Sequence, residues 1–134
     1  MKKLGGERGQ ALTELVLLLP IFLILVFAIV DFGMGFHSYI TVTNSAREGA
    51  RLGAVGGSSA AIAQRVRDTA STLDQGNLTV TVTNAQGPVG QSVTVKADYQ
   101  YNLITPLTGL MSFVSGGSIG PTLDVTSTAE MRLE

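Results

Sequence analysis

The chain has 134 residues and a formal net charge of −1, enough length for one domain beside a membrane segment. Its few basic residues are scattered and form no stripe with interleaved aromatics, so nucleic acid is not an expected partner. Cysteine is absent, which excludes disulfides and thiolate metal sites.

The first predicted element is a membrane helix near the N-terminus. Residues 15–30 contain neither a charged nor a polar side chain, and as an α-helix they would span about 24 Å. Adding residues 10–14 brings the length to about the 30 Å of a bilayer core. A soluble domain of this size cannot cover a helix that is apolar on every side. We therefore predict a transmembrane helix over residues 10–31 and an extracytoplasmic domain over residues 32–134.

The nine residues before this helix form a leader with three basic residues against one acid. Such a positive excess keeps its end of a span in the cytoplasm, which predicts an inside N-terminus and an outside C-terminal domain. A secretory signal peptide has a similar start. It is disfavoured because Glu14 directly adjoins the apolar run, Pro20 interrupts the run, and no Ala-x-Ala site follows Val30.

Glu14 is the carboxylate inside the membrane-length window. An acid within a membrane is costly and is by default a functional candidate. An acid at the headgroup boundary, in contrast, simply suits the start of a helix and its dipole. The position of Glu14 alone leaves both interpretations open.

The surroundings of Glu14 carry a resemblance. Gly9 precedes the sequence QALTE (residues 10–14), and the apolar run follows at once. This order resembles the prepilin signal of the type IV pilin superfamily, in which a peptidase cuts after a Gly and a Glu is fifth in the mature chain. Residues 10–20, 31–33 and 44–51 are also similar to the TadE-like family of tight-adherence (Flp-type) pilus systems, whose members are small pilin-like or pseudopilin proteins.

The resemblance implies cleavage between Gly9 and Gln10 and assembly through the N-terminal helix. The new amine of Gln10 would be neutralised by Glu14 of an adjacent subunit, so that neither charge is buried unpaired. The implied partners are other pilin-like subunits, the prepilin peptidase and the inner-membrane assembly platform. Leu15 replaces the aromatic residue of major Flp pilins, and the chain is longer than theirs. Both departures favour a TadE-like subunit and leave the choice among shaft, tip and priming roles open.

Pro20 lies inside the predicted membrane helix. It has no N–H to donate to the carbonyl of Val16, although neighbouring segments can compensate for this loss in a membrane. Pro20 therefore predicts either a mild kink or a point where the helix unwinds as it packs into a filament. Gly33 and Gly35 follow as a candidate hinge, each costing about 1 kcal/mol relative to Ala.

The helix is expected to continue to about Gly53 and to present its core face through an apolar stripe at helical spacing. The members of this stripe are Phe36, Tyr39, Ile40, Thr43, Ala46, Ala50 and Ala54. Glu48 and Arg51 are three residues apart and can pair, whereas Arg47 and Arg51 repel each other unless another carboxylate bridges them. These charges are either a solvated face or an inter-subunit contact.

The second half of the chain predicts a short helix followed by strands. Ser58 or Ser59 can cap a helix over about residues 60–73. The period then changes to two, which predicts strands at 78–83, 93–103 and 123–133, with a short apolar helix at 107–114. The fold class is therefore α+β and type IV pilin-like, with a long N-terminal helix packed on a small antiparallel sheet of about three strands.

No catalytic constellation is present in the sequence. The single histidine, the missing cysteines and the dispersed carboxylates predict no enzyme, no metal and no cofactor. The predicted function is a pilin-like structural subunit or minor pseudopilin of a type IVc (tight adherence) pilus, in the cytoplasmic membrane and then in an extracellular pilus. The alternative is a single-pass anchored binding module that keeps its leader and never assembles.

Overall fold

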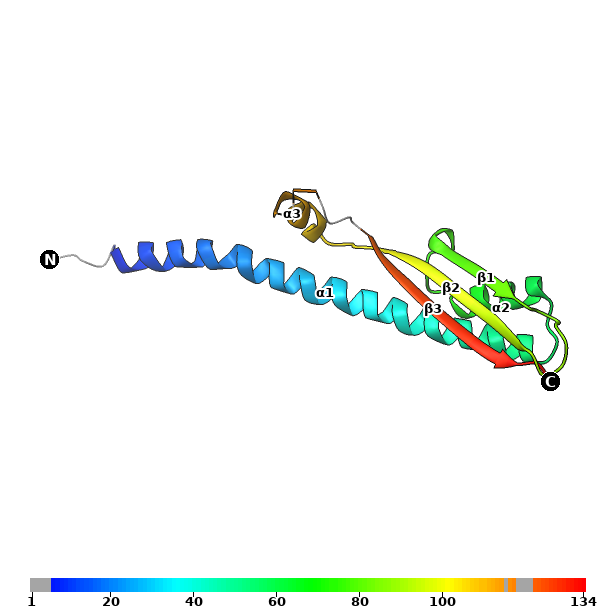
Figure 1. Cartoon of the computed structure of the whole chain (residues 1–134). Helices are drawn as coiled ribbons and strands as arrows, with labels where there is room; N and C mark the ends of the chain where they lie inside the picture. Colours follow the sequence, from blue (N-terminus) through cyan, green and yellow to red (C-terminus); the bar gives the residue numbers. More distant parts are fainter. Residues whose placement is uncertain (1–5, 115, 118–121) are drawn as a thin grey trace.

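The computed structural model describes residues 6–114, 116–117 and 122–134 (Figure 1). One long helix, α1 (Gly6–Ala54), runs through the whole molecule, and a small sheet domain packs on its C-terminal half. This layout confirms the predicted α+β pilin-like fold. The elements that follow α1 are α2 (Ser59–Thr69), a 3₁₀ turn (Gln75–Asn77), β1 (Leu78–Thr83), β2 (Ser92–Asn102), α3 (Leu107–Val114) and β3 (Thr122–Arg132).

Helix α1 contains 49 residues, which corresponds to a length of about 74 Å. It begins at Gly6, inside the predicted leader, and continues unbroken through Pro20, Gly33 and Gly35. In Figure 1 its N-terminal half extends away from the sheet domain. The glycines therefore do not interrupt the helix in this structure.

The sheet is an antiparallel meander in the order β1-β2-β3. Its register pairs Val82 with Val95 and Val95 with Ala129, so that one face carries the apolar side chains of all three strands. Alternate residues of β2 are buried from Val93 to Tyr101. The opposite face is polar and rich in threonine, as the period of two predicts.

Helices α1 and α2 cover the apolar face of the sheet. The close approach of α1 depends on small residues. A Cβ at Gly49 would lie 2.5 Å from Val66 of α2, and a Cβ at Gly53 would lie 2.9 Å from Val93 of β2. Helix and sheet thus pack more closely than side chains at these positions would allow.

The predicted core face of α1 is correct at its C-terminal end and wrong at its N-terminal end. Ala46 and Ala50 are fully buried. Phe36, Tyr39 and Ile40, in contrast, remain 55%, 51% and 44% exposed. The buried positions there carry small or polar side chains instead, because the sheet supplies the large ones. The ring of Tyr101, for example, lies 3.7 Å from where a Cβ of Gly35 would be.

Helix α2 is capped as predicted and is shorter than predicted. The Ser58 hydroxyl accepts a hydrogen bond from the Ala61 N–H at 3.3 Å. The helix ends at Thr69, and the Gln75 side chain donates to the carbonyl of Ala70 at 2.9 Å. This contact ties the end of α2 to the turn that leads into β1.

Candidate assembly and membrane site

The N-terminal half of α1 is an apolar surface without a cover. Nearly all its large side chains between Leu12 and Val30 are exposed, by 36% to 68%. By length and composition this helix is able to cross a membrane, and it lies near the N-terminus. It therefore has the character of a single-pass membrane anchor.

The predicted processing residues lie on the first turns of α1. The Gln10 side-chain amide donates to Glu14 Oε1 at 3.2 Å, and both side chains are exposed. The Thr13 hydroxyl donates to the carbonyl of Gly9 at 2.9 Å. A Cβ at Gly9 would meet nothing within 4 Å, so packing within this subunit does not require a glycine there.

Pro20 has a tertiary neighbour that sequence reasoning missed. It lines an apolar groove together with residues from α1 and from the start of α3, namely Leu23, Ile24, Phe27, Pro106 and Leu107. In Figure 1, α3 lies apart from the sheet and alongside α1. The segment that follows β2 therefore returns to the anchor half of the long helix.

Asp31 holds the loop between β2 and α3 in place through Ile104 and Thr105. Its side chain is only 2% exposed, although it directly follows the apolar run. It accepts a hydrogen bond from the Ile104 N–H at 3.1 Å and another from the Thr105 hydroxyl. Sequence reasoning treated Asp31 only as the end of the membrane segment, since no spacing rule links it to residues more than seventy positions later.

Tyr101 lies beside Asp31. Burial raises the pKa of the Tyr101 phenol, and the neighbouring Asp31 charge raises it further. The phenol therefore stays neutral at physiological pH and places no second negative charge next to the carboxylate. Among the described residues no hydrogen-bond partner meets the Tyr101 hydroxyl in good geometry.

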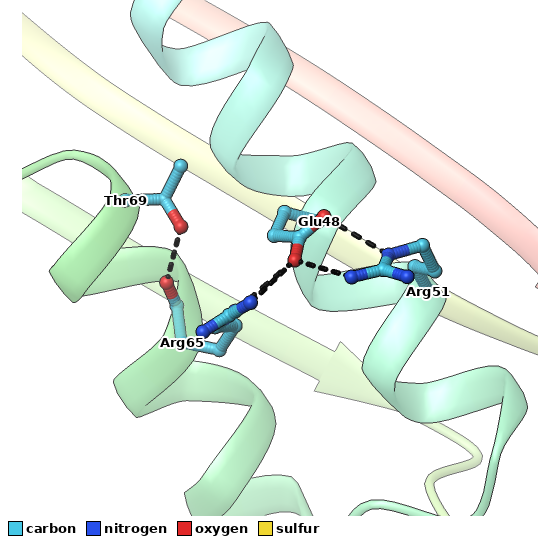
Figure 2. A network of polar contacts seen from close by, with 4 residues as sticks. All are labelled: Glu48, Arg51, Arg65 and Thr69. Carbon is cyan, nitrogen blue, oxygen red and sulfur yellow. Dashed lines mark hydrogen bonds and ion pairs between the residues drawn. The ribbon is translucent and has the colours of Figure 1, made fainter.

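The predicted pairing of Glu48 with Arg51 is present, and a third residue joins it (Figure 2). Glu48 Oε1 lies 2.9 Å from Arg51 Nη2 and 2.7 Å from Arg65 Nη2 of α2. Hydrogen bonds from these two guanidinium groups lower the pKa of Glu48 to about 2, from an ordinary value of 4.5. Arg65 was not foreseen because its approach depends on how α2 packs against α1.

Arg47 is exposed and lies in the same open groove as Glu48, Arg51 and Arg65. It forms no ion pair with any residue in the described part of the chain. Asp68 also lines the groove, so its lining carries three arginines and two carboxylates. Glu48 is already engaged by Arg51 and Arg65, which leaves Arg47 as the arginine of the predicted cluster without an ion pair among the described residues.

Residues 9–51 match the model of the family described as TadE-like protein. The predicted TadE-like resemblance is confirmed. No curated protein and no solved structure matches the chain. The matched residues, here called the TadE-like segment, form α1 from Gly9 to Arg51 and do not include the sheet.

All the predicted site residues lie in the TadE-like segment. Two contacts lead from this segment to the rest of the chain: Glu48, a predicted residue, reaches Arg65 of α2, and Asp31, which was not predicted, reaches the loop before α3. The TadE-like family is a structural, non-enzymatic one. Within residues 6–114, 116–117 and 122–134, no group of three or more acidic or histidine side chains is placed to hold a metal ion.

Proposed function

We propose that this protein is a pilin-like subunit of a tight-adherence (type IVc) pilus system. Residues 1–9 act as a leader that a prepilin peptidase removes, residues 10–31 cross the cytoplasmic membrane, and residues 32–134 form the domain outside it. The observation that carries the proposal is the division of the TadE-like segment. Its first half is apolar and uncovered, whereas its second half is built into the sheet domain.

Uncovered apolar side chains need a partner, which is lipid before assembly and other subunits afterwards. The N-terminal half of α1 offers a continuous surface for both. The sheet packs only on the second half, and the start of α3 meets only part of the first half, so most of this surface stays free. A subunit of this shape can move from membrane to filament without rearranging its own core.

Glu14 is proposed to set the axial register between neighbouring subunits. Cleavage after Gly9 gives Gln10 a charged amine. In an apolar helix bundle this amine needs a carboxylate, and an unpaired buried charge would cost several kcal/mol. Glu14 is exposed, and its side-chain partner among the described residues is the neutral amide of Gln10. It is therefore available to a neighbour.

Arg47 is proposed to supply a second inter-subunit contact, with an acidic residue of a neighbour. Glu48 and Arg51 support this role indirectly. Glu48 pairs with both Arg51 and Arg65, and these three residues line the groove beside Arg47. The ion pairs therefore fix the shape of the groove next to Arg47. Pro20 is proposed to contribute to helix packing at the apolar groove that it lines.

Intact-mass measurement on membrane fractions tests processing first. The proposal expects a mature chain that has lost residues 1–9 and a Gly9→Ala chain that keeps them. Gly9→Ala is a clean variant because the added methyl meets no neighbour within the subunit. A wild-type chain that still begins at Met1 would instead support the anchored binding module.

Assembly is tested with Glu14→Leu, using Glu14→Asp as the control that keeps the charge. Glu14→Leu should insert and be cleaved normally, because it makes the segment more apolar and leaves the leader and Gly9 intact. The fraction of processed protein in sheared surface filaments should fall sharply, and Glu14→Asp should retain part of it. Equal incorporation of Glu14→Leu and wild type would show that Glu14 only starts the helix.

A further inference from the structure

The starting observation is the path of the chain between β2 and β3. After β2 the chain does not turn directly into β3. It follows α1 toward the N-terminus, where Asp31 binds the backbone of Ile104 and the hydroxyl of Thr105. Helix α3 then begins at Leu107, which lies against the anchor half of α1.

The contacts of Leu107 give the level of α3 along α1. Leu107 shares its groove with four residues of α1, of which Pro20 is the first and Phe27 the last. These two residues precede Asp31 by eleven and four positions, or about 16 Å and 6 Å along the helix. With the membrane boundary at Asp31, where the apolar run ends, the start of α3 lies about 6–16 Å inside it. The shallow part of this range is the depth at which helices lie in a membrane interface, roughly 5–10 Å.

The composition of the segment fits this level. No charged residue occurs between Asp98 and Asp124, the part of the chain that contains α3. The helical form of α3 pairs only part of its backbone groups internally, and the groups at its two ends still need partners. This suits the headgroup boundary, where water is available, better than the centre of the bilayer. Ile104, next to the Asp31 contact, is 65% exposed.

Asp31 also fits a position at the membrane boundary. A carboxylate facing lipid would be costly. Here the loop that carries α3 shields it, and two hydrogen bonds compensate for its lost hydration. The contact of Asp31 with Ile104 and Thr105 shields the carboxylate from lipid. The same contact therefore directs α3 toward the lipid.

We propose that α3 is a second membrane contact of the subunit. It lies in the leaflet nearest to the sheet domain, and its partner is the acyl-chain and headgroup boundary of that leaflet. The inference rests on the proposed function only in requiring that α1 crosses the membrane. Two contacts, α1 and α3, would fix the rotation of the sheet domain about the α1 axis, which a single helix cannot do.

Lipid quenching on the full-length protein tests this placement, and the absence of cysteine makes single labelling sites straightforward. Ser112→Cys and Gly109→Cys place a bimane label on α3. Ser112 is exposed, and a Cβ at Gly109 would meet nothing within 4 Å. Ile29→Cys on the exposed surface of α1 is the membrane control, and Thr81→Cys on the polar face of the sheet is the aqueous control.

The labelled proteins are reconstituted in vesicles of phosphatidylethanolamine and phosphatidylglycerol with brominated acyl chains. The expected result is quenching of both α3 labels to an extent close to that of Ile29→Cys, with no quenching of Thr81→Cys. If Ile29→Cys is quenched and the α3 labels behave like Thr81→Cys, then α3 is not a membrane contact and the proposal is overturned.

Two further outcomes are distinguishable. Unquenched α3 labels, together with disulfide cross-linking of the unlabelled Ser112→Cys protein to a second chain, would identify another copy as the partner of α3, which also overturns the proposal. Failure of quenching at Ile29→Cys itself would overturn the membrane anchor, and with it both the proposed function and this inference. Unchanged thermal melts of each variant confirm that the label reports on the folded protein.

Discussion

The two halves of α1 share one backbone and differ in almost everything that surrounds it. From residue 15 to residue 30 the side chains are apolar, and most of them are large and exposed, while from residue 31 to residue 54 most residues of one face are small or polar and buried. The comparison shows that side-chain size, rather than apolar character, decides which half the sheet covers. A sheet can approach Gly49 and Gly53 closely, and bulky side chains would prevent this.

The largest effect on stability is expected for Ala50→Glu. Ala50 is fully buried, so the variant must either bury an unpaired carboxylate or open the core. The free energy of unfolding should fall by at least about 3 kcal/mol. Ala61→Glu, at an exposed position near the start of α2, is the matched control and should be nearly neutral. Thermal melts of the full chain in detergent measure both variants. Equal melting temperatures for Ala50→Glu and Ala61→Glu would show that Ala50 is not part of the buried core.

The next largest effect is expected for Asp31→Ala. The substitution leaves the Ile104 N–H and the Thr105 hydroxyl without their acceptor, which costs about 1–3 kcal/mol. The loss should be local and appear as faster hydrogen exchange at the Ile104 amide, with little change in β1. Asp31→Asn keeps one acceptor and should give an intermediate rate. Exchange at Ile104 that does not respond to either change would show that Asp31 does not hold the loop.

A smaller effect is expected from the titration of Glu48. Its pKa is lowered to about 2 in the folded chain from an ordinary value of 4.5, so the folded state binds this proton less readily than the unfolded state. The resulting stability is present above pH 4.5 and is lost as the pH falls from about 4.5 to about 2. Because the group is exposed to solvent, the change in unfolding free energy should be small.

An NMR titration of the Glu48 carboxyl tests this directly. Arg65→Gln removes one of its two arginine partners and should raise the pKa toward 4.5, while Arg132→Gln, away from this carboxylate, should leave it unchanged. An equal pKa in all three proteins would contradict the bridging position of Glu48 between α1 and α2.

The smallest effect is expected for Phe36→Ser, which sharpens the boundary between the two halves. Phe36 is 55% exposed, so the variant should change the unfolding free energy of the sheet domain by less than about 0.5 kcal/mol. Val42→Ser, on the fully buried face one and a half turns later, should cost more than about 1 kcal/mol. Comparable losses in both variants would restore the original prediction that Phe36 belongs to the core face.

The sequence by itself determined the elements and their order. The uninterrupted apolar run predicts the anchor, a cap at Ser58 or Ser59 marks the start of α2, and the alternation from Leu78 onward predicts three strands. The bounds of β1 and α3 were predicted to the residue. These features depend on neighbours within a few positions, so local periodicity is sufficient to reveal them.

Only the tertiary structure decided which surfaces meet. Which face of α1 is buried against the sheet depends on the large side chains of the strands, such as Tyr101. These residues are distant from α1 along the chain. The same holds for Asp31 with Thr105 and for Glu48 with Arg65, whose partners are distant along the chain. Periodicity along one helix shows which faces are apolar or small. It does not show which of two such faces a distant segment will cover, because that choice depends on the shape and size of the partner.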